Sequence, residues 1–431
     1  SQLQGDPQPP GAAPQPECTA PNPAKPSLRQ VLRSTVLIGV AVTGLVTLMR
    51  WGGLLEALEL STYDTLVRLS PAEAQDERLL LITVDDQDIE YQAANGMALQ
   101  GTLSDQALRL LIEALQPLEP QSIGLDVYRP GGLNLPASAA DLAIFAICKA
   151  PAAEGGDPTG VAPPPDWPIS QIGFSDFVTD RDGVLRRHLL AIQNLSPASR
   201  CTASNALSLL LALYYLQEAG VAYELTPERE FRFGDVLLRR LTPHAGGYRN
   251  VDAAGYQLML RYRGQRPQDI AAAIPLRQLL SGELSPALIE QLQGRIVLVG
   301  STALTSADAW TAPQSWGKPE VERRVPGVVM QAQMVSQVLS AVLDQRPLLW
   351  WWPEWIEVLW IGLWAMVGAG LAHLRRGVWL VPVELGAIAV SCYGILGLGG
   401  WVPLVPPVMA LAAAAALTRR IVRRRASALP E

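Results

Sequence analysis

Four long apolar segments limit what this chain can fold into. The first, residues 31–49, reads VLRSTVLIGVAVTGLVTLM and carries one charge, near its start. Three more follow toward the C-terminus, over about residues 349–374, 378–398 and 402–421. A hydrocarbon core roughly 30 Å thick is crossed by about 20 apolar residues in a helix. The sequence therefore predicts four transmembrane helices, which we assign to residues 28–50, 348–374, 378–398 and 402–421.

Positive charge predicts the orientation of these helices. Lys25, Arg29 and Arg33 lie at the start of the first helix, Arg375 and Arg376 separate the second from the third, and residues 419–425 follow the core of the fourth with five arginines. With four spans all three clusters face one side, which the positive-inside rule makes cytoplasmic. We expect a multi-pass protein of the plasma (inner) membrane with both termini in the cytoplasm. The thylakoid membrane and lumen are the alternative compartment.

The remaining parts follow from this topology. Residues 1–27 are rich in Pro, Gln, Ala and Gly, a composition that cannot bury a core, and predict a disordered cytoplasmic tail. Residues 422–431 predict a short basic cytoplasmic tail. Residues 51–347 then form one large periplasmic domain. No broad basic surface with interleaved aromatic residues occurs, so we expect the lipid bilayer, and no nucleic acid, as a partner.

The periplasmic domain opens with a strand, a helix and a second strand. LLLITVDD predicts a buried strand, SDQALRLLIEALQP predicts a helix with Ser104 as its N-cap and Pro117 as its stop, and QSIGLDVYRP predicts the next strand. This order indicates a right-handed parallel crossover. We expect Asp85, Asp86 and Asp126 at the carboxyl ends of adjacent strands.

A third strand of the same kind supplies further polar groups. GRIVLVGST ends in Ser301 and Thr302, and Asp308 follows in the loop before a predicted helix. Ligands of parallel sheets bind at the carboxyl ends of the strands. The candidate ligand-binding residues are therefore Asp85, Asp86, Asp126, Ser301, Thr302 and Asp308. The alternative is that Asp85 or Asp86 caps a helix or pairs with Arg129.

The middle of the domain does not continue this pattern of parallel strands and crossover helices. Residues 173–190 alternate around Asp180, Asp182 and Gly183 and predict a hairpin, in which a tight turn is favoured over a calcium loop. Residues 205–220 predict an apolar helix too short to span, and residues 255–264 predict another strand. The predicted fold class is an α/β extracytoplasmic domain: a parallel-sheet core with crossover helices and an inserted hairpin and helix region.

Two of the four cysteines lie in the exported region. Cys148 and Cys201 could form a disulfide in an oxidising compartment, whereas Cys18 is in the predicted cytoplasmic tail and Cys392 in a helix. Two unpaired buried thiols are the alternative. Residues alone leave this choice open.

The order of motifs resembles the type 2 CHASE domain, an extracytoplasmic sensory module found beside cyclases and histidine kinases. The stretches that carry the resemblance are LELSTYDTLVRLSP, LLLITVDDQDI, SIGLDVYRP, GFSDFVTDRDGVLRRHLL, LRYRG, GRIVLVGSTALTSADAWTAP and VPGVVMQAQ. The arrangement of one helix before and three after the domain is similar as well. Segments around Cys148 and Cys201 look like the cyanobacterial branch, which implies the disulfide.

Two departures from the family affect function. Gln331 stands where the family commonly has His, so a site that relies on that imidazole would be altered. Members of the family usually carry a cytoplasmic output domain after the last helix, whereas about ten residues follow it here. We therefore expect signalling through a partner membrane protein or a separate cytoplasmic output protein, with a homodimer as a further possibility.

No catalytic set is recognisable. The three histidines lie in unrelated contexts, and no phosphate loop, nucleophile elbow or HExxH motif occurs. We expect no enzyme, no cofactor and no metal; a hydrolase built on the aspartates is the enzymatic alternative. The predicted function is a membrane-anchored periplasmic sensory module that binds a ligand or a protein. The alternative is an accessory or assembly subunit of a larger membrane complex, without ligand sensing.

Overall fold

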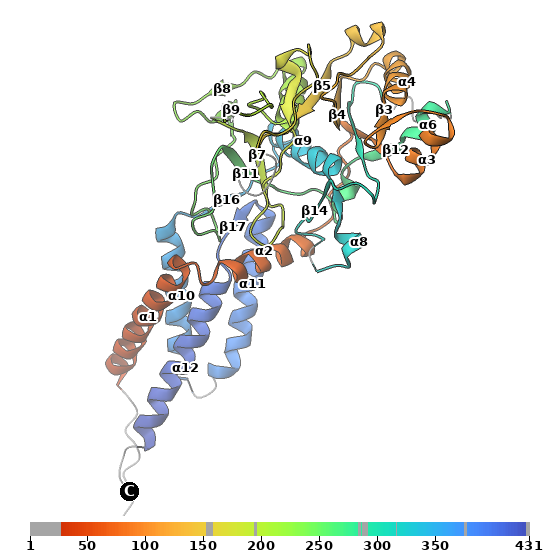
Figure 1. The fold of residues 1–431 in the computed structure, drawn as a ribbon. Coiled ribbons are helices and arrows are strands. Elements are labelled where there is room, and N and C mark those ends of the chain that lie inside the picture. Colours follow the sequence, from red (N-terminus) through yellow and green to blue (C-terminus); the bar gives the residue numbers. More distant parts are fainter. Residues whose placement is uncertain are drawn as a thin grey trace, which may run out of the picture. The chain divides into compact units, whose positions relative to one another are not determined.

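The computed structural model describes residues 27–151, 158–193, 196–282, 286, 292–315, 317–374 and 377–427 (Figure 1). The predicted disordered tail, Cys18, Arg375, Arg376 and the end of the basic tail lie outside the described residues, apart from Ser27. The chain divides into two compact units. One comprises residues 49–357 and 388–405, and the other comprises residues 358–387 with the parts before 49 and after 405.

A six-stranded parallel sheet forms the centre of the larger unit. Its strand order is β12 (Ala272–Pro275), β1 (Leu79–Val84), β13 (Ile296–Ser301), β4 (Ser122–Tyr128), β5 (Ile144–Cys148) and β6 (Ile172–Phe174). The predicted α/β fold with a parallel-sheet core is confirmed.

The predicted adjacency of β1 and β4 is wrong, because β13 lies between them. Ile296, Val297, Leu298 and Val299 of β13 are all fully buried, and a strand that is apolar on both faces belongs in the middle of a covered parallel sheet. The strand end that carries Asp85 and Asp86 is therefore separated by one strand from the end that carries Asp126.

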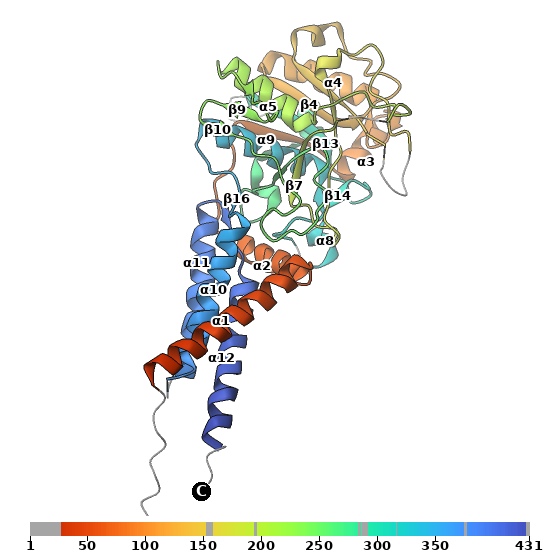
Figure 2. The ribbon, with the colours of Figure 1, turned by 90° about the vertical axis from the view of Figure 1, so that its left-hand side faces the viewer.

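Helices cover both faces of this sheet (Figure 2). Leu79 and Leu81 of β1 join the core under α5 (Leu207–Glu218) and α9 (Gly327–Leu343). Leu80 and Ile82 join the opposite core, under α4 (Asp105–Leu115) and α6 (Leu276–Leu280). This alternation follows from the two-residue period of a strand. The predicted helix 205–220 is confirmed as α5.

Helix α4 shows why the local prediction succeeds. The Ser104 hydroxyl accepts a hydrogen bond from the Ala107 N–H at 2.9 Å, as its N-cap role requires. Ala107, Leu108, Leu111, Ile112 and Leu115 are buried along one stripe. Pro117 stands in the 3-10 turn η1 (Gln116–Leu118), where the α-helix ends.

The predicted hairpin over residues 173–190 is wrong. Its first half, β6, joins the central sheet, whereas its second half, β7 (Arg187–Ala191), pairs antiparallel with β11 (Tyr256–Met259). The tight turn between them is present, since the Gly183 N–H donates to the Asp180 carbonyl oxygen at 2.9 Å and Gly183 has a φ of 78°. Each half finds apolar neighbours on a different sheet, so the halves separate.

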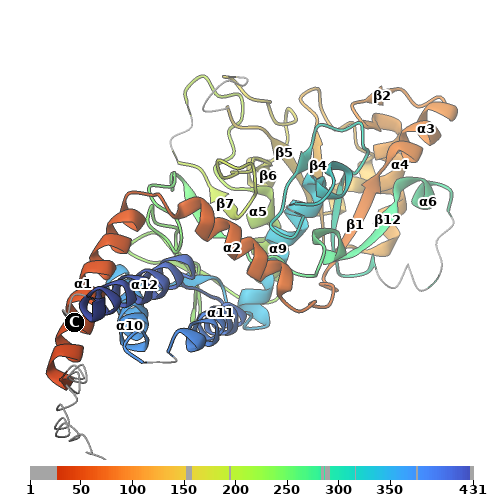
Figure 3. The same cartoon turned by 90° about the horizontal axis from the view of Figure 1, so that it is seen from below.

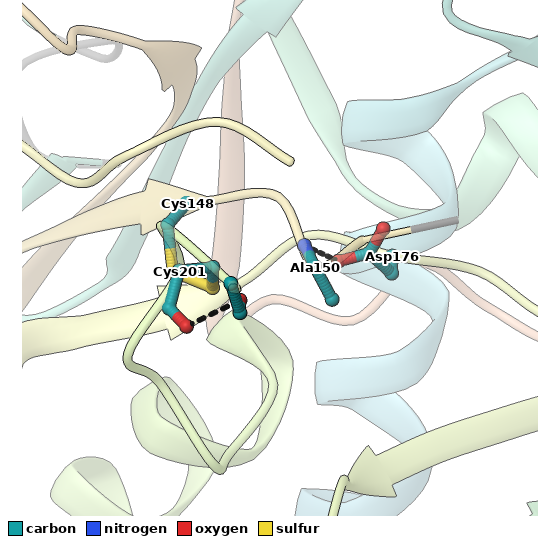
Figure 4. Close-up of a disulfide and its surroundings, with 5 residues drawn as sticks. Cys148, Ala150, Asp176 and Cys201 are labelled. Atoms are coloured by element: carbon teal, nitrogen blue, oxygen red, sulfur yellow. Dashed lines mark hydrogen bonds between the residues drawn. A yellow bond between two sulfur atoms is a disulfide. The ribbon is translucent and has the colours of Figure 1, made fainter. Parts of the chain in front are cut away.

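A disulfide joins Cys148, the last residue of β5, to Cys201, with an S–S distance of 2.04 Å (Figure 4). It matches the pairing implied by the family resemblance. Cys392 is a buried free thiol in α11 (Val381–Gly397).

Three described helices are long and apolar enough to cross a membrane: α1 (Leu28–Trp51), α10 (Glu354–Leu371) and the Val405–Arg424 part of α12 (Val405–Ser427). The third predicted segment, residues 378–398, forms the 3-10 turn η5 (Gly377–Leu380) and α11, which at 17 residues is shorter. Within the smaller unit α10 and α12 run side by side (Figure 3). A Cβ at Gly368 would lie 2.2 Å from the Leu411 carbonyl oxygen, so this approach needs glycine.

Short elements complete the described structure. They are α2 (Glu56–Leu69), α3 (Asp86–Ala94), β2 (Leu99–Gln100), β3 (Leu103–Ser104), η2 (Ala137–Asp141), η3 (Ile169–Gln171), β8 (Glu224–Leu225), β9 (Phe231–Phe233), β10 (Val236–Leu237), η4 (Pro267–Ile270), β14 (Ala309–Trp310), α8 (Glu320–Arg323), β15 (Val325–Pro326), β16 (Trp350–Trp351) and β17 (Gly400–Trp401).

Candidate functional site

A cavity of about 1030 Å³ lies at the carboxyl edge of the central sheet, entirely within the larger unit. Four strands of the sheet contribute residues at or just after their ends: Asp126 on β4, Lys149 after β5, Ser175 and Asp176 after β6, and Ser301 on β13. Asp308 and Trp310 enter from the loop that follows β13. The wall also includes Phe177, Asp252, Ala254, Gln257 and Ala307. Convergent strand ends thus form a concave polar site, as is typical of parallel sheets.

The structure brings together half of the predicted ligand-binding set. Asp126, Ser301 and Asp308 line the cavity, whereas Asp85, Asp86 and Thr302 do not. The inserted strand β13 explains the division, because it moves the end of β1 one strand further from β4. Whether the three lining residues bind a ligand stays a prediction.

Asp85 instead caps helix α3. Its carboxylate accepts a hydrogen bond from the Asp88 N–H at 2.9 Å, and the Asp88 carboxylate accepts one from the Asp85 N–H at 2.9 Å. Arg277 adds an ion pair to Asp85 at 2.8 Å. The helix-cap alternative is confirmed for Asp85, but its cationic partner is Arg277. Arg129 lies 3.6 Å from Asp105.

Asp86 and Thr302 hold backbone in place. The Asp86 carboxylate accepts hydrogen bonds from the Leu304 N–H at 2.9 Å and the Thr305 hydroxyl at 3.0 Å. The Thr302 N–H donates to the Val84 carbonyl oxygen at 2.9 Å. Both residues therefore connect the start of the 302–308 loop to β1 and α3, beside the cavity wall but outside it.

Asp126 is the most confined carboxylate of the cavity, with 9% of its surface exposed. Its Oδ1 accepts a hydrogen bond from the Ser175 hydroxyl at 2.6 Å, and the Gln331 amide donates to the same hydroxyl at 3.1 Å. Its Oδ2 is buried and has no partner among the described residues. Burial, and then the charge of Asp308, raise the pKa of Asp126 to about 7.

Asp308 is the second carboxylate of this pair. It accepts a hydrogen bond from the Trp310 indole N–H at 2.7 Å, and burial raises its pKa although that bond and Lys149 oppose the change. A Cβ at Gly327 would lie 2.0 Å from Asp308 Oδ2, so the start of α9 must be glycine. Trp310 in turn packs edge-to-face on Phe177, with ring centroids 4.9 Å apart.

Sequence reasoning missed Ser175, Asp176 and Lys149. The Asp176 carboxylate accepts a hydrogen bond from the Ala150 N–H at 2.7 Å (Figure 4), and burial raises its pKa to about 6 against the charge of Lys149. A signal was present, because polar residues follow the apolar runs of β5 and β6 as they follow those of β1 and β4. Treating residues 173–190 as a hairpin concealed it.

Gln331 lies directly behind Asp126, one hydrogen bond away through Ser175. Its side chain is 1% exposed, and its amide oxygen has no partner among the described residues. This is the position at which the resemblance to the CHASE family leads us to expect His. A Gln in place of the expected His therefore changes the first member of the hydrogen-bond chain that ends at Asp126.

A second group of charges, all buried except Asp182, lies close to the cavity. We call Asp64, Asp180, Asp182, Arg186 and Arg187 the arginine cluster. Arg186 pairs with all three aspartates at 2.7 Å, and Arg187 pairs with Asp180 at 2.8 Å. Hydrogen bonds to Asp64 and Asp182 raise the pKa of Arg186 against the opposing effect of burial. The Asp180 and Asp182 carboxylates are thus occupied by arginine, which accounts for them without calcium.

Three further charged side chains meet within the larger unit. Arg50, at the end of α1, forms an ion pair with Glu357, in the first turn of α10, at 2.7 Å, and Arg249 approaches the same carboxylate at 3.4 Å. All three side chains are buried. Glu357, which the sequence marks as an unusual carboxylate in an apolar segment, is therefore part of an ion-paired group.

Within the part of the chain that the structure describes, no group of three His, Cys, Asp or Glu side chains is placed to hold a metal ion. The cavity carboxylates instead form a pair, with acceptor atoms suited to hydrogen-bond donors.

Comparison with protein families matches residues 41–370 to the CHASE2 domain. Searches among curated proteins and among solved structures find no match. The match covers more than half of the chain and includes every residue of the cavity. The chain belongs to the CHASE2 family, whose domain is an extracellular sensory module, and its apolar helices are consistent with a membrane anchor.

Proposed function

We propose that this protein is a membrane-anchored sensory module that binds a small molecule in the cavity at the carboxyl edge of its sheet, without catalysing a reaction. The observation that carries the proposal is that Asp126 Oδ2 is buried without a hydrogen-bond partner among the described residues. A buried carboxylate oxygen without a partner is costly, and it borders a cavity large enough for a small organic ligand. A ligand that donates to this oxygen would recover part of that cost.

A chain of hydrogen bonds supports transmission from the cavity to α2, the helix that follows α1 in the sequence. Arg187 donates to the Gln257 side chain at 2.8 Å and to the Asp252 carbonyl oxygen at 2.9 Å, and both residues line the cavity. Asp180 connects Arg187 to Arg186, which donates two bonds to Asp64 of α2. A change at the cavity wall would therefore bear on α2, provided that ligand binding favours one of two states.

The proposed topology keeps four helices in the membrane. Helix α11 is apolar, and together with η5 it extends over residues 377–397, close to the length that spanning requires. Both termini would be cytoplasmic and residues 51–347 periplasmic, as the positive-inside rule favours. Cysteine substitutions labelled from one side of intact cells would test this: Ser427→Cys should be protected from an impermeant reagent and Asp235→Cys should react.

Native mass spectrometry of the full chain in nanodiscs would test ligand binding. After incubation with a metabolite extract, we expect a bound small molecule on the wild-type protein. Ala254→Trp and Ala307→Trp, which add an indole at two different segments of the wall, should abolish binding while leaving the unfolding temperature unchanged. Val390→Trp, at an exposed position of α11, is the matched control.

Equal binding to the wild type and both cavity variants, or no bound molecule on any of them, would contradict the sensory proposal. The second outcome would favour the accessory-subunit alternative. Purification in mild detergent would then be the discriminating measurement, because an accessory subunit should retain a stoichiometric partner. A sensory protein of this class should be recovered alone, as a homodimer, or with a separate output protein.

A further inference from the structure

We propose that the ligand of the cavity is a small organic cation with a primary ammonium group, which binds between the carboxylates of Asp126 and Asp308. This inference rests on the proposed sensory function and specifies the chemistry of its ligand. It is carried by three observations: the charge of the cavity wall, the unpaired acceptor on Asp126, and the aromatic side chains beside Asp308.

The charge of the wall favours a cation. Its ionisable residues include four carboxylates, Asp126, Asp176, Asp252 and Asp308, and two cationic side chains, Arg129 and Lys149. The charge of Arg129 is offset from outside the cavity, because its guanidinium lies 3.6 Å from the carboxylate of Asp105, which does not line the wall. Lys149 and Asp252 are both exposed. The less exposed part of the wall therefore presents three carboxylates, those of Asp126, Asp176 and Asp308, and their negative charge favours a cation over an anion.

The hydrogen-bonding pattern favours an ammonium group over a tetraalkyl cation. Asp126 Oδ2 is a free acceptor at a buried position, and the Ser175 hydroxyl occupies the other oxygen. An ammonium carries three donors, so it can satisfy Oδ2 and still reach Asp308, whose Oδ1 already accepts from Trp310. A charge-assisted bond of this kind is roughly twice as strong as a neutral one.

The aromatic pair supplies the apolar part of the site. Phe177 and Trp310 both line the cavity and pack edge-to-face on each other. Trp310 is held by its bond to Asp308, so the ring and the carboxylate are fixed together. Alkyl chains next to an ammonium group would contact this wall, and aromatic rings favour cations over anions.

An inorganic divalent cation fits these residues less well. Calcium takes six to eight oxygen ligands as a rule, and among the described residues no three carboxylate, His or Cys side chains are grouped to hold a metal ion. The volume of about 1030 Å³ also exceeds what a single ion needs. Calcium is nevertheless included in the test, because it shares the charge of the proposed ligand.

The test uses three probes with the same four-carbon chain, namely 1,4-diaminobutane, 1,4-butanediol and butanedioate, together with calcium chloride. Each is titrated calorimetrically into the full chain in nanodiscs. We expect the diamine to bind and the diol, the dianion and calcium to bind about tenfold more weakly or not at all. Asp126→Asn and Asp308→Asn should each weaken diamine binding about tenfold or more. Both variants keep the size of the side chain, and unfolding temperatures would show that they fold.

Asp235→Asn is the matched control, since Asp235 is an exposed aspartate of the same unit outside the cavity. It should leave diamine binding unchanged. Three results would overturn the inference: equal affinity for the diol or the dianion, unchanged diamine affinity in Asp126→Asn, or no diamine binding up to about 10 mM.

Failure of this inference is distinguishable from failure of the sensory proposal. If the diamine does not bind but the metabolite extract still leaves a molecule on the wild type and not on Ala254→Trp, the cavity binds a ligand of another class. If neither the probes nor the extract bind, both proposals fall.

Discussion

Two groups of buried aspartates in the larger unit meet opposite electrostatic environments. In the arginine cluster, the carboxylate of Asp64 is fully buried and receives two hydrogen bonds from Arg186, whose side chain is 1% exposed. In the cavity, Asp126 is nearly as buried, yet its nearest ionisable influence is another carboxylate, that of Asp308. The charge of a buried aspartate is thus offset by arginine in the arginine cluster, whereas no cation offsets it at Asp126.

We infer that this difference separates structural carboxylates from those that we propose bind a ligand. Transfer of a charge from water into a protein interior costs several kcal/mol unless partners and hydrogen bonds replace the water. The arginine cluster provides such partners within the chain, although burial still raises the pKa of Asp64 against the hydrogen bonds from Arg186. The cavity does not provide them for Asp126, so a cost remains in the folded protein that a ligand can relieve.

Removing the arginine should give the largest effect. Arg186→Met leaves Asp64 buried without its arginine partner, whereas Asp180 keeps Arg187, and breaking a buried pair in this way costs about 3–5 kcal/mol. We expect a marked fall in the unfolding temperature of the full chain in detergent. Arg266→Met is the control, since Arg266 pairs with Asp269 at the exposed surface and its replacement should leave the unfolding temperature nearly unchanged.

If Arg186→Met and Arg266→Met proved equally stable, Arg186 would not be offsetting the buried charge in the arginine cluster. A rescue variant would test this directly: adding Asp64→Asn to Arg186→Met should recover part of the stability, because it removes the buried charge that has lost both hydrogen bonds from Arg186. The same Asp64→Asn change alone should destabilise.

Neutralising Asp126 in the cavity should stabilise the protein, and by less than the loss of Arg186 destabilises it. Burial and Asp308 raise the pKa of Asp126 from the ordinary aspartate range to about 7, so the folded protein holds more protons than the unfolded chain between about pH 4 and 7. Stability should therefore fall as pH rises through this window. Asp126→Asn should be more stable than the wild type at pH 8, by on the order of 2 kcal/mol, and equal to it near pH 4.

Several groups face Asp126 from the neighbouring elements. They are Tyr128 on β4, Lys149 after β5, Asp176 after β6, Asp308 after β13, and the uncharged Ser175 and Gln331. Unfolding temperatures of wild type and variant across pH 4–8 would measure the effect. A variant that loses stability at pH 8 would show that Asp126 is compensated after all.

The sequence predicts the local elements of this fold better than their arrangement. Strands β1, β4 and β13, helix α4 and the turn at Gly183 follow from apolar runs, an N-cap serine and turn residues, all of which are local. The order of strands is not local: β13 enters between β1 and β4 from nearly two hundred positions away in sequence. Non-local pairing left no signal in the residues of β1 or β4.

The prediction of the candidate site was limited in the same way, because it depended on the order of the strands. Three of its predicted residues, Asp126, Ser301 and Asp308, line the cavity because their strands are neighbours in the sheet. Asp85 and Asp86 obey the same rule of polar residues at strand ends, but their strand lies beyond β13. Arg277, the partner of Asp85, comes from a distant helix and could not be chosen from sequence in preference to Arg129.

Replacing the capping aspartate Asp85 should change the stability less than either change above. Asp85 is an intermediate case between the aspartates of the arginine cluster and those of the cavity. Its bond to the Asp88 N–H, together with the return bond from Asp88, stabilises the first turn of α3, so Asp85→Ala should cost about 1 kcal/mol. The partly exposed pair with Arg277 adds little to this.

The pH dependence of this variant should also run opposite to that of Asp126→Asn. Although burial opposes it, the hydrogen bonds from Arg277 and the Asp88 N–H lower the pKa of Asp85. Its stabilisation is therefore present above the ordinary aspartate pKa and is lost as pH falls through the lowered value. The difference in unfolding temperature between wild type and Asp85→Ala should be full at neutral pH and should shrink in acid. Asp86→Ala, which removes two exposed bonds to the 302–308 loop, should cost less. A larger loss for Asp86→Ala than for Asp85→Ala would mean that attachment of that loop, rather than the helix cap, is what the acidic end of β1 provides.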